Sequence, residues 1–232
     1  MSTFVDAIEF FFAHLSLFAA KTVEHLELSL AAVGVSFALA VPLGVWLGHL
    51  HRGSFVAINM ANVGRAVPSL AIIAVGIAVL GLGFVPTTTA LVLLAAPIML
   101  TNAYVAVDGV DPDAVDAARG MGMTPSEVLW RVEIPLALPL TFAGIRTATV
   151  YVIATATLAA VTGGGGLGEI IVNQASYGAE GVVAGAIAVA VLALVAELAL
   201  AAAQRAVTPK GLRGQPGDQP VAGPPRPAAT NV

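Results

Sequence analysis

Five long apolar segments, separated by short polar stretches, dominate this chain of 232 residues. Their approximate bounds are 26–50, 55–84, 87–107, 138–161 and 182–207. Each is long enough to cross the hydrocarbon core of a bilayer as a helix, which takes about 20 apolar residues. Only 10% of all residues are charged, whereas soluble proteins carry about 25%. The pattern predicts an all-α polytopic membrane protein and excludes a soluble globular domain.

The two ends of the chain differ from this apolar region. Residues 1–25 mix aromatic side chains with Asp6 and Glu9, which favours a helix lying in the membrane interface over a sixth span. No basic stretch precedes their apolar part and no small-residue cleavage site follows it, so we expect no cleaved signal peptide. Residues 208–232 are rich in proline and glycine and are predicted to be disordered. The membrane domain is therefore expected to cover residues 26–207.

Residues 111–139, DPDAVDAARGMGMTPSEVLWRVEIPLALP, form the longest polar stretch between apolar segments. Asp111 followed by Pro112 is typical of a helix start, with aspartate as the N-cap and proline at the first helical position. Gly120 and Gly122 should interrupt this helix, because glycine readily adopts the conformations in which helices end.

A second short helix should begin immediately after the glycines. Thr124-Pro125-Ser126-Glu127 is a capping box, and Pro135 is expected to end the helix that it starts. Helices shorter than about 12 residues are not stable alone in water. Both helices also carry apolar side chains, such as Met121 and Trp130. They must therefore pack on a surface, which is either their own bundle or a partner protein.

The same stretch resembles the EAA signature of bacterial ABC-importer permeases: Glu-Ala-Ala, three residues, Gly, nine residues, then Ile-x-Leu-Pro. The residues at the signature positions are Asp116, Ala117, Ala118, Gly122, Val132, Ile134 and Pro135. Asp116 stands where glutamate is usual, and Val132 and Ile134 stand for isoleucine and leucine. The runs at 118–123 and 133–139 resemble the glycine betaine/carnitine/choline branch of these permeases.

The resemblance implies a type I ABC-importer permease fold, with about five transmembrane helices and a cytoplasmic coupling-helix loop. The seven signature residues would dock on a cytoplasmic ATP-binding subunit. A second permease, identical or homologous, and an extracytoplasmic substrate-binding protein would complete the importer. The implied function is ATP-driven uptake of osmoprotectants such as glycine betaine, choline, carnitine or proline across the bacterial cell membrane. Uptake of another small solute, such as methionine, is the alternative.

The basic residues predict the orientation of the chain. Lysine and arginine in short loops stay on the cytoplasmic side of a membrane. With five spans and the N-terminus outside, every arginine and Lys210 lie inside or near the inner face, and only Lys21 lies outside. The polar stretch 111–139 and the C-terminus are then cytoplasmic.

Polar residues within the apolar segments are candidates for the solute path. They are Asn62, Arg65, Pro68, Ser69 and Asn102. A charge and a proline in one apolar run are typical of a broken helix that lines a cavity. The same pattern also fits a span that begins near Ala66, with the Arg65 side chain reaching the inner face. The residues alone leave both interpretations open.

Two glycines in the first span, Gly44 and Gly48, have the spacing that permits close contact between helices. His49 and His51 follow at its end. A His-x-His pair can bind metal, but no third ligand is near in the sequence, so we interpret both as interfacial residues.

Other classes of protein lack support in the sequence. It contains no cysteine, no Gly-x4-Gly-Lys-Ser/Thr loop and no His-Glu-x-x-His helix. Residues 163–168, GGGGLG, fit a nucleotide-binding pattern, but no strand precedes them; we expect a tightly turned link followed by a short helix at Glu169. An ion-coupled carrier would need several paired carboxylates within its spans, and only Glu197 lies deep in one. We expect no enzymatic activity, cofactor, metal or nucleic-acid partner.

Overall fold

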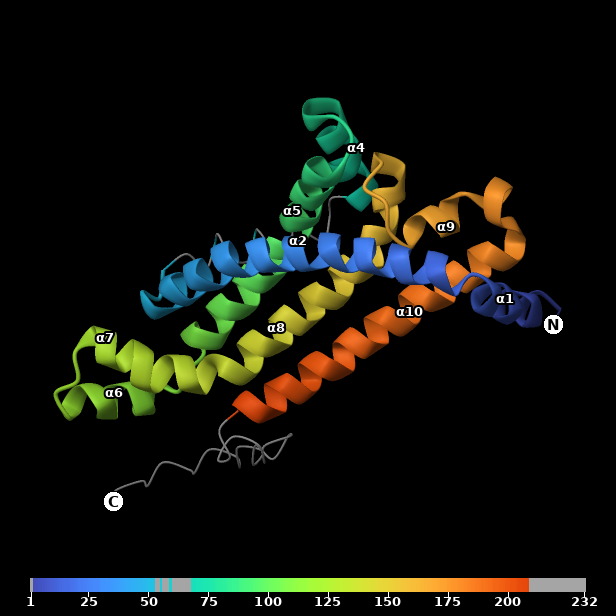
Figure 1. Ribbon diagram of the computed structural model, residues 1–232. Helices are drawn as coiled ribbons and strands as arrows, with labels where there is room; N and C mark the ends of the chain where they lie inside the picture. Colours follow the sequence, from blue (N-terminus) through green and yellow to red (C-terminus); the bar gives the residue numbers. More distant parts are fainter. Residues whose placement is uncertain (1, 53–54, 56–58, 60–67, 209–232) are drawn as a thin grey trace, which may run out of the picture.

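The computed structural model describes residues 2–52, 55, 59 and 68–208. Within these residues the chain is helical, as Figure 1 shows. The helices are α1 (Ser2–Ala13), α2 (Leu15–His49), α4 (Ser69–Leu80), α5 (Phe84–Asp108), α6 (Pro112–Gly120), α7 (Pro125–Val128), the π-helical η1 (Leu129–Glu133), α8 (Ile134–Thr155), the 3-10 helix η2 (Ala156–Thr162), α9 (Gly168–Val172) and α10 (Gln174–Val207). The predicted all-α class is confirmed.

Four helical segments in the described part are long and apolar enough to cross a membrane. They are Leu15–His49, Phe84–Asp108, Pro125–Thr162 and Gln174–Val207. The remaining predicted span is represented by α4, an apolar helix of 12 residues, which is about 18 Å long. The residues directly before α4, 60–67, lie outside the described part.

The first long helix begins earlier than the sequence predicts. α2 starts at Leu15 and contains 35 residues, about 52 Å of helix. The predicted boundary at residue 26 therefore falls inside a continuous helix. The polar residues that set that boundary have distant partners, because Lys21 pairs with Glu169 and the Glu24 carboxylate accepts a hydrogen bond from the Gly166 N–H. α1 is a separate helix that packs mainly on α10 (Figure 1).

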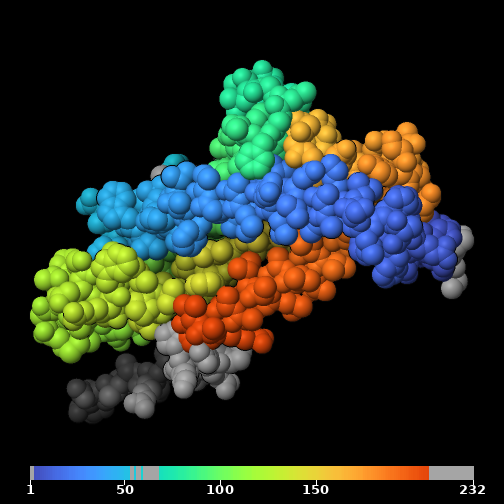
Figure 2. Space-filling model, in the orientation of Figure 1, coloured from blue at the N-terminus to red at the C-terminus, as the bar shows by residue number. Residues whose placement is uncertain are grey.

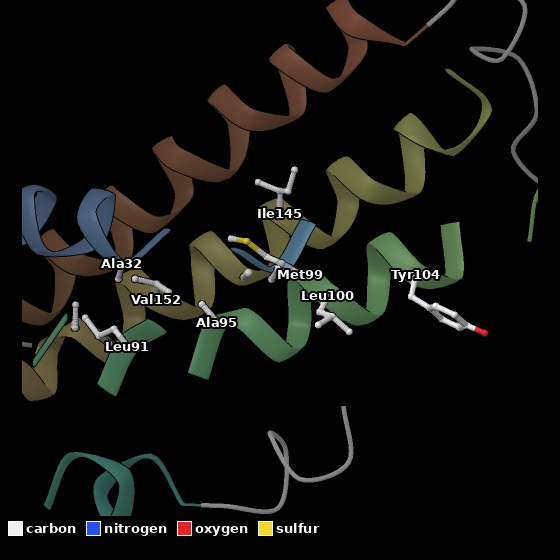
Figure 3. Packing of buried hydrophobic residues seen from close by; sticks show 11 residues of the cluster. Ala32, Leu91, Ala95, Met99, Leu100, Tyr104, Ile145 and Val152 are labelled. Atoms are coloured by element: carbon white, nitrogen blue, oxygen red, sulfur yellow. The ribbon is translucent and has the colours of Figure 1, made fainter. Parts of the chain in front are cut away.

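The core lies where α2, α5 and α8 meet. Figure 3 shows side chains from these three helices in contact, among them Ala32, Leu91, Met99 and Val152. α5 is the central helix. The rest of the chain buries 61% of the most apolar 18-residue stretch of α5, against 17% of the corresponding stretch of α10. Small residues allow the helices to approach closely, as membrane helices require.

The two glycines of α2 make the close contact that their spacing permits. A Cβ atom at Gly44 would lie 2.5 Å from the Leu100 carbonyl oxygen, and one at Gly48 would lie 2.8 Å from the Tyr104 carbonyl oxygen. Both carbonyls belong to α5, so any side chain here would push α2 away from α5.

The glycine link, residues 163–168, turns tightly and leads into α9, as predicted. Gly163, Gly165 and Gly166 have φ values of +70°, +76° and +82°, a region in which glycine is favoured. The link is held to α2, because the Gly166 N–H donates to Glu24 at 2.9 Å and Lys21 Nζ lies 2.6 Å from Glu169 Oε2.

The bundle has two distinct ends (Figure 1). At one end lie α6, α7 and the last turns of α2 and α10, and we call this the loop end. At the other lie α1 and α9, which we call the link end; Figure 2 shows the same arrangement over the surface.

Candidate docking loop and solute-path residues

The α5–α8 loop, residues 109–133, begins with the helix start that the sequence predicts. Asp111 accepts a hydrogen bond from the Asp113 N–H at 3.0 Å, and Pro112 occupies the first turn of α6. α6 ends at Gly120 and the chain reverses at Gly122, whose φ is +85°. No atom of the described residues lies within 4 Å of a Cβ built at Gly122. Glycine is therefore required by the backbone conformation at this position and not by a close neighbour within the chain.

The second predicted helix start is also present. The Glu127 N–H donates to Thr124 Oγ1 at 3.4 Å, and the Thr124 N–H donates to Glu127 Oε2 at 3.0 Å. These reciprocal bonds satisfy two backbone donors at the start of α7.

The predicted end of this helix at Pro135 is wrong. α7 continues through η1 into α8 without a break, and Pro135 lies in the first turn of α8. The Ile134 N–H donates to the Leu129 carbonyl, five residues back, so one π turn is inserted directly before the proline. Such a turn changes the hydrogen-bond register at the point where proline has no N–H to donate. The second short helix is thus the first part of the α8 segment.

One side of the loop packs on its own bundle. Val115, Ala118 and Val128 are buried in a cluster with residues at the end of α5 and with Ala137 of α8. Val132 packs on the edge of this cluster. The loop therefore has a hydrophobic base that positions it rigidly on α5 and α8.

The opposite side of the loop is exposed and partly apolar. Met121 is 73% exposed and Trp130 is 67% exposed. Asp116 and Ala117 are also exposed, and Asp116 forms only a long surface contact with Arg119, at 3.8 Å. An exposed methionine is typical of a surface that a partner covers. Trp130 borders instead an apolar groove with Val41 of α2 and Phe142 of α8.

The seven signature residues divide between these two sides. Asp116, Ala117 and Gly122 are exposed; Ala118 is buried, and Val132, Ile134 and Pro135 are half-buried. Three of them are therefore available to a partner. Ala118 and Val132 pack the loop on the bundle, and Ile134 and Pro135 belong to the first turn of α8.

Both ends of the loop contact the end of α2 through histidines. His49 Nδ1 lies 2.6 Å from Glu133 Oε2, and the Glu133 side chain is 1% exposed. His51 Nδ1 lies 2.9 Å from Asp108 Oδ1 in a more exposed pair. The sequence interpretation of both histidines as interfacial residues missed these contacts, because the partners lie 84 and 57 residues away.

The predicted path residues do not form one cluster in the described part of the chain. Asn62 and Arg65 lie outside it. Pro68 is the N-cap of α4 and Ser69 its first residue, and α4 packs on the first half of α5. Asn102 donates to the Ile98 carbonyl at 2.8 Å and lies against Gly144, where α5 crosses α8.

The chain matches a known protein family over most of its length. Residues 40–209 match the model of the family "Binding-protein-dependent transport system inner membrane component". The glycine betaine/carnitine/choline transport system permease protein OpuCB of Bacillus subtilis is 44% identical over 195 residues, which is 84% of this chain and 90% of the relative. The osmoprotectant import permease protein OsmW of Salmonella typhimurium is 35% identical over 215 residues, 90% of this chain and all of the relative.

Solved structures have the same fold. A chain of the MetNI methionine ABC transporter in an inward-facing conformation superposes with a TM-score of 0.73 at 21% identity, covering 84% of this chain and 98% of that one. An amino acid ABC transporter solved with histidines has a TM-score of 0.66 at 20% identity, covering 88% and 98%.

Proposed function

The chain belongs to the family of inner membrane components of binding-protein-dependent transport systems, and from this premise we propose that it imports osmoprotectants. It is a permease subunit and not an enzyme, since ATP hydrolysis in such systems belongs to a separate ATP-binding subunit. The proposed solutes are small quaternary amines and related zwitterions: glycine betaine, carnitine, choline or proline. The names of its relatives across 84–90% of the chain support this choice.

Uptake measurements test the solute. The permease is reconstituted in proteoliposomes with its ATP-binding subunit and supplied with its binding protein and internal ATP. Uptake of labelled glycine betaine, carnitine, choline and proline is compared with uptake of methionine, and vesicles without ATP are the control. We expect ATP-dependent uptake of at least one osmoprotectant and none of methionine. Uptake of methionine alone would reject the proposed solutes and retain the permease function.

We also propose that the exposed side of the α5–α8 loop docks on the ATP-binding subunit. Met121 and the exposed signature residues Asp116, Ala117 and Gly122 would form the contact. The buried base of the loop on α5 and α8 supports this role, because a rigid base transmits a displacement of the loop to the spanning helices. ATP-driven closure of the partner would then shift the bundle between inward-open and outward-open states.

A second permease copy or a homologue would complete the pathway. The exposure of α10 supports this part of the proposal, because the rest of the chain buries only 17% of the most apolar 18-residue stretch of this helix. Its remaining surface needs lipid or another subunit.

The proposed orientation places the N-terminus outside, and the loop end and C-terminus in the cytoplasm. Two observations support it: the arginines in the α5–α8 loop belong to α6 and η1 at the loop end, and Lys21 pairs with Glu169 of α9 at the link end. Reporter fusions at residues 125 and 207 should report a cytoplasmic location, and fusions at 86 and 175 an external one. An external signal at 125 would refute docking on a cytoplasmic ATPase.

A further inference from the structure

An ion pair joins α8 to α10 deep within their apolar segments. Arg146 Nε lies 2.9 Å from Glu197 Oε1. Arg146 is twelve residues from the start of α8 and Glu197 ten residues from the end of α10, so each lies about 15–18 Å along its helix. The orientation predicted from the sequence put every arginine inside or near the inner face. Arg146 instead lies beside Glu197, the acid that was expected deep in its span. Charged residues at such depths are rare and mark solute or ion pathways in many membrane proteins.

Gln204 completes a small polar cluster around this pair. Arg146 Nη1 donates to Gln204 Oε1 at 3.0 Å, and Gln204 Nε2 donates to the Pro139 carbonyl at 2.8 Å. Nη1 thus donates to Gln204 and Nε pairs with Glu197, whereas Nη2 has no partner among the described residues. The guanidinium can therefore bind a further anionic group without losing Glu197.

The pair is only partly covered by the chain. The side chain of Arg146 is 33% exposed and that of Glu197 is 35% exposed. A partly exposed charge at this depth is strongly disfavoured against lipid tails, so it faces protein or a water-filled cavity. The uncovered side of the pair therefore faces away from lipid.

The side of α10 that faces away from Glu197 is apolar. Ile187, Val191 and Val195 border an apolar groove of about 450 Å³ between α10 and α1. Val195 precedes Glu197 by two residues, which places it about 200° around the helix. α10 is therefore apolar on the side of Val195, whereas on the other side it carries Glu197 and Gln204 among apolar residues that include the exposed Leu194.

We propose that the charged side of α8 and α10 lines the solute path, and that Arg146 and Glu197 bind the two charges of a zwitterionic solute. The free guanidinium donors take the carboxylate, in the geometry that arginine and carboxylates favour. Glu197 faces the quaternary ammonium group. The solute class rests on the proposed function, whereas the assignment of the path does not.

Cysteine accessibility tests the path alone. The chain contains no cysteine, so single-cysteine variants need no altered background. Ala201→Cys lies one turn from Glu197 on the same side of α10, and Val195→Cys on the apolar side is the matched control. In the assembled complex, a membrane-impermeant charged thiol reagent should label the first at least tenfold faster than the second. Equal rates, or no labelling of Ala201→Cys, would overturn the assignment.

Solute selectivity tests the roles of the charges. Arg146→Gln should lower ATP-dependent uptake of glycine betaine about tenfold or more, because a charge-assisted hydrogen bond to the carboxylate is lost. Uptake of choline, which has no carboxylate, should change less than twofold in the same vesicles. Arg146→Lys keeps the ion pair and should restore part of the glycine betaine uptake. Arg205→Gln, at an exposed arginine of α10, is the control and should change neither.

An equal loss of both solutes in Arg146→Gln, with the complex assembled normally, would show that the pair only joins α8 to α10. If the wild-type complex took up neither solute, the proposed function would fail, and the labelling result would still decide the path.

Discussion

Replacing Gly122 with valine tests the role of the α5–α8 loop at a single backbone angle. The φ of +85° at Gly122 lies in the left-handed region, where an L-residue costs about 1–2 kcal/mol and a β-branched one up to about 3 kcal/mol. Steric overlap adds nothing within the chain, because the space around the Cβ position is open. The whole cost therefore falls on the conformation of the turn between α6 and α7.

A cost of about 2–3 kcal/mol lowers the population of the native turn by a factor of about 30–150. The valine is exposed and lies outside the α8 core, so insertion and expression should stay normal. Docking should suffer, because it needs α6 in its native position relative to α7. We expect Gly122→Val to reduce co-purification of the ATP-binding subunit, or to lower the number of solutes imported per ATP hydrolysed.

Two matched variants separate backbone strain from the added side chain. Gly120 has equally open space and helical backbone, so Gly120→Val should bind the ATPase normally. Gly122→Asn should be intermediate, because asparagine tolerates the left-handed conformation better than valine does. Normal uptake and normal ATPase binding by Gly122→Val would refute the reasoning, since the loop would then not be the coupling element.

Three further predictions, two of them with a control substitution, test other parts of the structure. Ala117→Trp should block co-purification of the ATPase by steric exclusion, whereas Asp116→Glu should leave uptake unchanged; a binding-competent Ala117→Trp would move the contact elsewhere. His49→Ala leaves the buried carboxylate of Glu133 without its partner and should cost about 1–3 kcal/mol, seen as a lower thermal midpoint of the detergent-solubilised protein; an unchanged midpoint would contradict this. Gly48→Leu should destabilise the protein by about 1–3 kcal/mol in the same assay through overpacking against α5, and Gly34→Leu, in open space on the same helix, should be neutral.

Local chemistry explains why parts of the loop could be predicted. The caps at Asp111 and Thr124 depend on residues two and three positions away, so the sequence alone contains both partners. The same holds for Gly122, whose turn follows from its neighbours. The close approach at Gly44 and Gly48 was predictable because a spacing of four places both glycines on one side of a helix.

Distant contacts explain most of what could not be predicted. The charged residues after which the first span was expected to begin are paired across the fold: Lys21 contacts Glu169, 148 residues away, and no local pattern predicts that partner. The Arg146–Glu197 pair is of the same kind. Pro135 is a different case. A proline usually ends a helix, but here the π turn at Leu129–Glu133 shifts the hydrogen-bond register and the helix continues through Pro135.

The contacts of α2 constrain how the bundle can move. At the loop end, His49 and His51 contact Glu133 and Asp108, on both sides of the α5–α8 loop. At the link end, Lys21 and Glu24 hold Glu169 and the glycine link. Between them, α2 packs on α5 without room for a methyl group at either of its two contact glycines. A displacement of the loop must therefore either break a buried polar contact or move α2 and α5 as one body, and the second route carries the motion directly to the glycine link.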